Sequence, residues 1–152
     1  MKLLPLLLAT LALAGCASAP MLPLPRTAPE AGGEVVIFRE SAFVAGGVDV
    51  AVGTGGGAFA FLGNSEKARA VFPPGTREIF VQARSAERST MSVQVRQGAT
   101  VCLRTSASPS TYAKVLVPIV MIATGYHFYL DEVPCPSAAE LAKYKDIPVT
   151  YQ

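Results

Sequence analysis

The chain has 152 residues, of which 51% are hydrophobic and 16% are charged, with a formal net charge of +2. This length fits a single domain of about 100–150 residues, and the apolar fraction excludes a disordered chain. The small charge without a basic cluster excludes a nucleic-acid-binding protein, and the lack of an apolar run of about 20 residues excludes a polytopic membrane protein.

The first predicted element is an export signal at the N-terminus. Lys2 supplies a positive charge, an apolar block follows at residues 3–14, and small residues precede Cys16. As a helix this block is about 18 Å long, which is too short to cross a bilayer core of about 30 Å. We therefore expect residues 1–15 to be removed as a signal peptide.

The end of this signal, Leu13-Ala14-Gly15-Cys16, resembles the lipobox of bacterial lipoproteins. In that family the cut falls before the cysteine, whose sulfur has first been linked to a diacylglycerol. The resemblance implies that Cys16 is lipidated and binds the membrane through its acyl chains. Because Ala17 follows, and not the Asp common in inner-membrane lipoproteins, it also implies an outer-membrane anchor with the domain facing the periplasm. An ordinary secretory signal with an incidental cysteine is the alternative.

Residues 16–33 are predicted to form a lipidated, Pro-rich tether between the membrane and the domain. Proline lacks a backbone donor and favours extended conformations, and two glycines close the segment. A first strand packed on the domain is the alternative, which we consider weaker because alternating prolines do not join a hydrogen-bond ladder.

From residue 34 to residue 152 the pattern predicts one all-β domain. Short segments rich in β-branched and aromatic residues are separated by turn-forming residues at nearly regular spacing. This spacing favours an antiparallel β-sandwich over a parallel sheet with crossover helices. The segments expected to be strands are residues 34–39, 48–52, 59–61, 67–72, 77–83, 91–95 and 99–104.

A glycine-rich segment, Val-Gly-Thr-Gly-Gly-Gly-Ala at residues 52–58, formally fits a dinucleotide-binding fingerprint. That site needs a helix N-terminus directly after the glycines, so that free N–H groups meet the pyrophosphate. Here Gly63-Asn64 soon interrupts the segment that follows. We interpret the glycines as a hairpin loop and expect no cofactor.

Cys102 and Cys135 remain as an even pair in an oxidising compartment, which favours a disulfide. Two free buried thiols and a redox-active pair are the alternatives, although the Cys-x-x-Cys spacing typical of redox activity is absent.

The uncharged stretch at residues 115–125 is interpreted as a core strand that Pro118 interrupts. The alternative is a loop that dips into a bilayer or binds a partner. The candidate binding surface comprises Val115, Ile119 and Met121 of this stretch together with Tyr112, Tyr126 and Tyr129. Tyr144 is a further candidate for an aromatic platform that would bind a glycan.

Near the C-terminus, Ser137 and Glu140 have the spacing of a capping box and predict one short helix, which Pro148 prevents from extending. His127 is the only histidine, and neither a ligand cluster nor a nucleophile turn accompanies it. Asp131 and Glu132 are adjacent in an expected strand and would point to opposite faces. We therefore expect neither a metal site nor a catalytic site.

The predicted segments follow one another in this order: a strand that ends at Phe38-Arg39, a Val-Asp-Val strand at 48–50, a Pro-Pro-Gly turn at 73–75, a turn at Gly98, and a Phe-Tyr-Leu segment at 128–130 before a Glu-Leu-Ala-Lys helix at 140–143. This order resembles a family of small bacterial lipoproteins known as a domain of unknown function, number 2846. Its turn at residues 73–75 is also similar to the PEGA-like strand turn of surface-layer and carbohydrate-associated β-sandwich modules. The apolar stretch at 115–125 and Cys102 depart from both.

Together these features predict a lipid-anchored, non-catalytic protein of the cell envelope with a structural or protein-interaction role. Its expected partners are the membrane, through the acylated Cys16, and an envelope protein or peptidoglycan. A periplasmic binding module for a glycan or another small envelope ligand is the alternative. An envelope hydrolase stands last, because no pair of nucleophile and base is recognisable.

Overall fold

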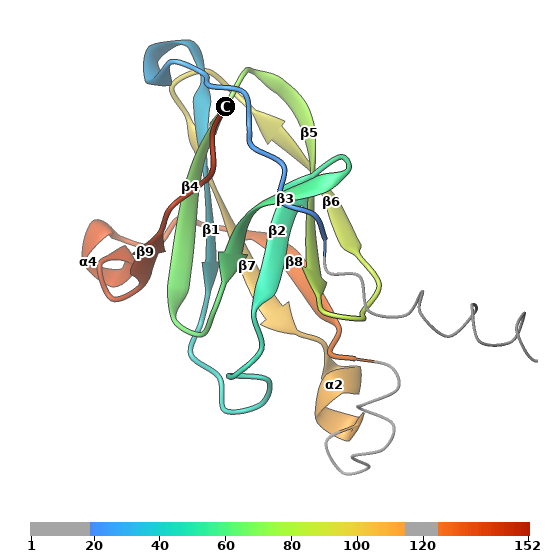
Figure 1. Ribbon diagram of the computed structural model, residues 1–152. Helices are drawn as coiled ribbons and strands as arrows, with labels where there is room; N and C mark the ends of the chain where they lie inside the picture. The colour runs from blue at the N-terminus through green and yellow to red at the C-terminus, as the bar shows by residue number, and fades with distance from the viewer. Residues whose placement is uncertain (1–18, 115–124) are drawn as a thin grey trace, which may run out of the picture.

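The computed structural model describes residues 19–114 and 125–152, which form two β-sheets that pack on each other (Figure 1). One sheet has five strands in the order β8-β7-β1-β4-β9, and the other has four in the order β3-β2-β5-β6. The predicted all-β sandwich with a short C-terminal helix is confirmed.

The first sheet consists of β1 (Gly33–Arg39), β4 (Glu66–Phe72), β7 (Thr100–Ala107), β8 (Phe128–Val133) and β9 (Lys145–Ile147). The second sheet consists of β2 (Val50–Thr54), β3 (Gly57–Leu62), β5 (Gly75–Ala83) and β6 (Ser89–Val95). The helical elements are η2 (Pro29–Ala31), α2 (Pro109–Lys114) and α4 (Ala138–Leu141).

Strand direction differs from the prediction in two places. Five strand pairs are antiparallel, but β1 pairs in parallel with β7, and β4 pairs in parallel with β9. In both cases, strands of the other sheet lie in the sequence between the two parallel neighbours. The alternation of apolar and polar residues shows which face of a strand is buried but carries no information about the direction of its neighbour.

Strand β1 is buried on both of its faces. Val35 and Ile37 point into the main core between the sheets, where they meet Val52 and Val81 of the four-stranded sheet. Val36 and Phe38 point the other way and belong to a separate cluster with Cys102 and Leu141. The segment at residues 134–144, which carries α4, therefore covers the outer face of the five-stranded sheet as a partial third layer. We call this segment the covering layer.

The Pro-rich segment differs from the free tether that we expected. From Ala19 to Arg26 this segment lies along the domain and joins β3 to the C-terminus. Ala58 donates a hydrogen bond to the Pro20 carbonyl at 2.8 Å and accepts one from Leu22 at 2.8 Å. Leu24 donates to Thr150 at 2.8 Å and accepts from Gln152 at 2.9 Å.

Prolines fit this arrangement because an extended chain presents its backbone groups alternately to each side. Leu22 and Leu24 supply the two N–H donors, and Pro23 and Pro25 fall at positions whose N–H would point away from these partners. Proline spacing, and not proline content, therefore decides whether such a segment can pack against a sheet edge.

The packing of this segment predicts a measurable contribution of Leu24 to stability. Leu24 is only 5% exposed and belongs to the main core. We expect Leu24→Ala to lower the free energy of unfolding in urea by about 2–3 kcal/mol, because it removes buried methyl groups and leaves a cavity. Met21→Ala is the matched control, since Met21 is 47% exposed, and it should change stability by less than about 0.5 kcal/mol. Equal effects of the two variants would contradict the packed position of Leu24.

Candidate functional site

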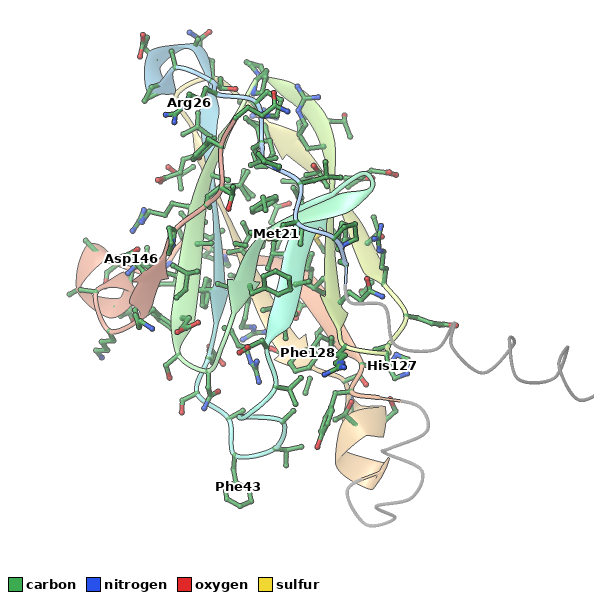
Figure 2. The ribbon with its side chains drawn as sticks, in the orientation of Figure 1. Met21, Arg26, Phe43, His127, Phe128 and Asp146 are labelled. Carbon is green, nitrogen blue, oxygen red and sulfur yellow. A yellow bond between two sulfur atoms is a disulfide. The ribbon has the colours of Figure 1, made fainter. Side chains whose placement is uncertain are left out.

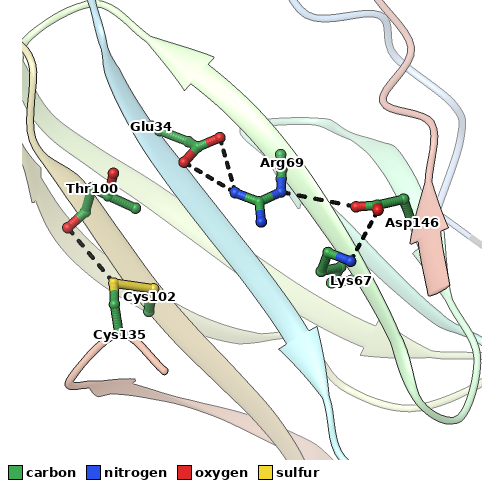
Figure 3. A network of polar contacts seen from close by, with 7 residues as sticks. All are labelled: Glu34, Lys67, Arg69, Thr100, Cys102, Cys135 and Asp146. Atoms are coloured by element: carbon green, nitrogen blue, oxygen red, sulfur yellow. Dashed lines mark hydrogen bonds and ion pairs between the residues drawn. A yellow bond between two sulfur atoms is a disulfide. The ribbon is translucent and has the colours of Figure 1, made fainter. Parts of the chain in front are cut away.

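The predicted disulfide is present between Cys102 and Cys135, whose Cα atoms lie 5.0 Å apart (Figure 3). Cys102 is buried on β7, and Cys135 lies in the exposed connection between β8 and α4. The bond therefore attaches the beginning of the covering layer to β7, an inner strand of the five-stranded sheet.

Helix α4 begins with the predicted capping box. The Ser137 hydroxyl accepts a hydrogen bond from the Glu140 backbone N–H at 3.3 Å, and the Glu140 carboxylate accepts one from the Ser137 N–H at 2.8 Å. Behind the helix, the Tyr144 ring packs edge-on against Phe38 with ring centroids 5.2 Å apart. Burial raises the pKa of the Tyr144 phenol. Tyr144 is therefore part of the packing of this layer.

The capping box makes the stability of α4 dependent on pH. The hydrogen bonds from the Ser137 side chain and backbone lower the pKa of Glu140. A lowered folded-state pKa means that the cap stabilises the helix above the unfolded-state pKa, about 4.3, and is lost as pH falls through the folded-state value. We expect an NMR titration of the Glu140 carboxyl to give a pKa below the ordinary one, and Ser137→Ala to raise it. An unchanged pKa in that variant would contradict the role of Ser137.

The covering layer is also held by a polar network (Figure 3). The buried Lys67 ammonium on β4 donates to the Tyr144 carbonyl at 2.7 Å and to the Asp146 carboxylate at 2.9 Å. Arg69 on the same strand lies 3.2 Å from Glu34 and 3.8 Å from Asp146. The two basic side chains are thus balanced by two carboxylates, and their pairs with Asp146 join β9 to β4. We therefore assign this network a structural role.

Arg39, which no sequence pattern singles out, is the largest of the fully buried side chains in the described part of the molecule. Arg39 ends β1 and is only 2% exposed. Its guanidinium donates to the carbonyls of Ala45, Val48 and Leu62, and lies 4.7 Å from the centre of the Phe128 ring. In the sequence it looks like an ordinary basic residue at the end of a strand, because its carbonyl partners have no sequence signature.

Arg39 braces the loop at residues 40–49, which connects the two sheets. Burial lowers the pKa of Arg39, while the nearby Asp49 and Glu66 carboxylates raise it. On the other side of the loop, the Asn64 amide bonds to both backbone groups of Ala42, at 2.9 and 3.2 Å. The braced loop holds the Phe43 side chain fully in solvent at its tip (Figure 2).

A hollow of about 460 Å³ lies over the outer face of the four-stranded sheet, beside Ala19. Its apolar lining includes Ala51 and Phe61, and its polar lining includes Asp49, Gln82 and Arg84. Gly47, Val48 and Tyr126 border it as well, so the braced loop and the point where the chain enters the domain share one surface.

Of the predicted binding residues, Tyr126, Tyr129 and Tyr144 have described side chains, and these three do not come together in one platform. Tyr126 borders the hollow, Tyr129 lies on β8, and Tyr144 packs under α4 on the far sheet. Tyr112 is in α2, but its side chain is outside the described part of the molecule, as are Val115, Ile119 and Met121. The interpretation of residues 115–124 as a core strand falls outside the described residues too, as do the signal peptide and Cys16.

Of the residues considered for catalysis, His127 has a structural partner for its backbone and Asp131 has one for its side chain. The backbone N–H and carbonyl of His127 both bond to the Thr111 hydroxyl at 3.1 Å. Asp131 and Glu132 are neighbours on β8, and Asp131 lies 3.5 Å from Arg104. Within residues 19–114 and 125–152, no three His, Cys, Asp or Glu side chains group in a way that could hold a metal ion.

The glycines at residues 52–58 form the predicted hairpin between β2 and β3. Thr54 pairs with Gly57, and Gly55 adopts a φ of +55°, which a side chain rarely allows.

None of the helices described here is long and apolar enough to cross a membrane.

Comparisons with protein-family models, with curated proteins and with solved structures find no match. The resemblance to the small bacterial lipoproteins therefore stays a prediction from the sequence.

Proposed function

We propose that the protein is a non-catalytic interaction module of the cell envelope, anchored to the outer membrane by a lipid on Cys16 and facing the periplasm. The observation that carries this proposal is the sequence Leu13-Ala14-Gly15-Cys16 at the end of a short apolar block with a basic start. Acylation at that cysteine would hold the whole domain at a membrane surface.

The disulfide supports export. Structural disulfides persist in oxidising compartments such as the periplasm and are rare in the cytosol. The Cys102–Cys135 bond joins two segments that are distant in sequence and fixes the covering layer to the sheet. A chain that depends on such a bond for its folded state gains from a location outside the reducing cytosol.

Strand β6 supports a role in protein interaction. It is the last strand of its sheet, and within the described residues no strand pairs with its outer edge. Its sequence, Ser89–Val95, contains neither a charged residue nor a proline, and these residues usually protect a sheet edge from pairing. By contrast, β8 at the edge of the other sheet carries the charged residues Asp131 and Glu132. An extended segment of an envelope protein could therefore add to β6 as a further strand.

The anchor is tested by growth with labelled palmitate and by flotation of the purified membranes. We expect label in the wild-type protein and none in Cys16→Ser, which should leave the membrane fraction. Equal labelling of the two proteins, or flotation of Cys16→Ser with the vesicles, would overturn the lipid anchor.

The interaction role is tested with a photo-crosslinking residue at Thr90 on β6, and with the same residue at Glu132 on β8 as a control. We expect one defined adduct from Thr90 and none from Glu132, and we expect Ser92→Lys to abolish the adduct by placing a charge on the β6 edge. An adduct that forms equally from both positions, or that survives Ser92→Lys, would argue against strand addition at β6.

A further inference from the structure

The position of Ala19 fixes where the chain enters the domain. Ala19 is buried on the outer face of the four-stranded sheet, in a cluster with Ala51, Ala58 and Phe80. The next residue, Pro20, accepts a backbone hydrogen bond from Ala58 at 2.8 Å. From Ala19 onward the chain is therefore part of the folded domain.

Only Ala17 and Ser18 separate Cys16 from this point. Three residues of fully extended chain span at most about 11 Å, so the Cys16 backbone cannot lie farther than that from the Ala19 backbone. If Cys16 carries the lipid, as the proposed function holds, the bilayer surface must lie close to the outer face of the four-stranded sheet. The segment after Ala19 adds no reach, because it is docked along β3.

The exposed apolar side chains lie on the same side. Among the residues that the structure describes, the large hydrophobic side chains left exposed are Met21, Leu22 and Phe43. Met21 and Leu22, each 47% exposed, follow the entry point directly. Phe43 extends from the braced loop, whose residues Gly47 and Val48 border the same hollow as Ala19 (Figure 2).

Two arginines accompany these apolar groups. Arg84 borders the hollow, and Arg88 stacks over Phe80 of the outer face, 4.1 Å from the ring centre. Asp49 is the acidic residue of the hollow. Arginine side chains combined with exposed apolar groups are typical of a surface that lies at the headgroup level of a membrane.

We propose that the part of the outer face of the four-stranded sheet around Ala19 and the hollow is a membrane-contact surface. It lies against the phospholipid bilayer that holds the anchor, with Met21 and Leu22 at the headgroup level and Phe43 inserted among the acyl chains. This orientation directs the opposite layer, with α4 and Asp146, away from the membrane (Figure 2). It rests on the acylation of Cys16.

The test uses single cysteines that carry an environment-sensitive fluorophore. Of the three native cysteines, Cys102 and Cys135 form the disulfide, and Cys16 carries the lipid in the proposed function. An introduced cysteine therefore supplies the only free thiol of the acylated chain. The labelled positions are Met21→Cys and Phe43→Cys on the contact surface, with Lys143→Cys on the opposite layer as the matched control. All three positions are exposed, and their substitution should leave the fold intact.

The acylated protein is placed in vesicles of phosphatidylethanolamine and phosphatidylglycerol, with or without lipids that carry a quencher near the headgroup. Flotation is measured first, and we expect the protein to float with the vesicles. We then expect the lipid quencher to reduce fluorescence at positions 21 and 43 at least two-fold more than at position 143.

The outcomes separate the two proposals. Equal quenching at the three positions, or quenching restricted to position 143, overturns the membrane-contact surface and leaves the anchor in place. If the fluorophores at positions 21 and 43 are protected from a water-soluble quencher but are not quenched by the lipid, a protein covers this face. That result also overturns the membrane-contact surface. Failure of the protein to float overturns the anchor, and the orientation with it.

Discussion

Replacing Cys102 and Cys135 together with alanine is expected to lower the free energy of unfolding by about 3–4 kcal/mol, less any strain in the native bond. The disulfide joins residues that are 33 positions apart, so it removes many conformations from the unfolded chain. The loss should appear in urea denaturation as a lower midpoint. The α4 segment should also exchange its amide hydrogens faster, because its covalent attachment to β7 is gone.

Reduction of the wild-type protein provides the matched control. A reductant should lower the stability of the wild-type protein to the level of the double variant and should leave the double variant unchanged. The single variant Cys135→Ala should resemble the double variant, since Cys102 is buried and an apolar environment accepts a free thiol. If the reductant has no effect on the wild-type midpoint, the two sulfurs are not bonded in the purified protein.

Replacement of Arg39 by alanine is the second large expected effect, a loss of about 3–5 kcal/mol. The guanidinium is the donor for the carbonyls of Ala45, Val48 and Leu62. A buried carbonyl left without a donor costs about 1–3 kcal/mol, and the variant leaves several such groups next to a new cavity. The contact with the Phe128 ring is lost as well.

Two further variants test this explanation by urea denaturation. Arg39→Lys keeps the charge but has one compact donor group where the guanidinium has a planar fork, so an intermediate loss is expected. Arg69→Ala removes an arginine whose side chain is 42% exposed from ion pairs with Glu34 and Asp146, and should cost less than about 1 kcal/mol. Similar losses from Arg39→Ala and Arg69→Ala would contradict a special role of the buried guanidinium.

Several features of the fold were predictable because their causes are local. The β-branched and aromatic residues at 34–39 and the alternation at 77–83 correspond to β1 and β5, and the glycines near Gly55 form the expected hairpin. The spacing of Ser137 and Glu140 predicted the start of α4, because a capping box closes within one turn. The disulfide was predictable from the number of cysteines and the expected compartment, without any geometry.

The candidate functional surface was predictable only in part. Tyr126 borders the hollow beside Ala19, but Phe43 and Arg84 were not among the predicted binding residues. An exposed phenylalanine in a loop looks the same in a sequence as a buried one, and only the bracing by Arg39 and Asn64 shows that its side chain is held in solvent.

The amino-acid sequence alone was sufficient for the all-β class, most of the strand-forming segments, the pairing of Cys102 with Cys135 and the cap of α4, since each depends on residue type and short spacing. It did not indicate β9. The tertiary structure decided the parallel neighbours of β1 and β4, the burial of Arg39 and the docking of the Pro-rich segment on β3. These features depend on backbone groups that are far apart along the chain. Backbone carbonyls and N–H groups are the same at nearly every residue, so no local pattern shows which of them will meet.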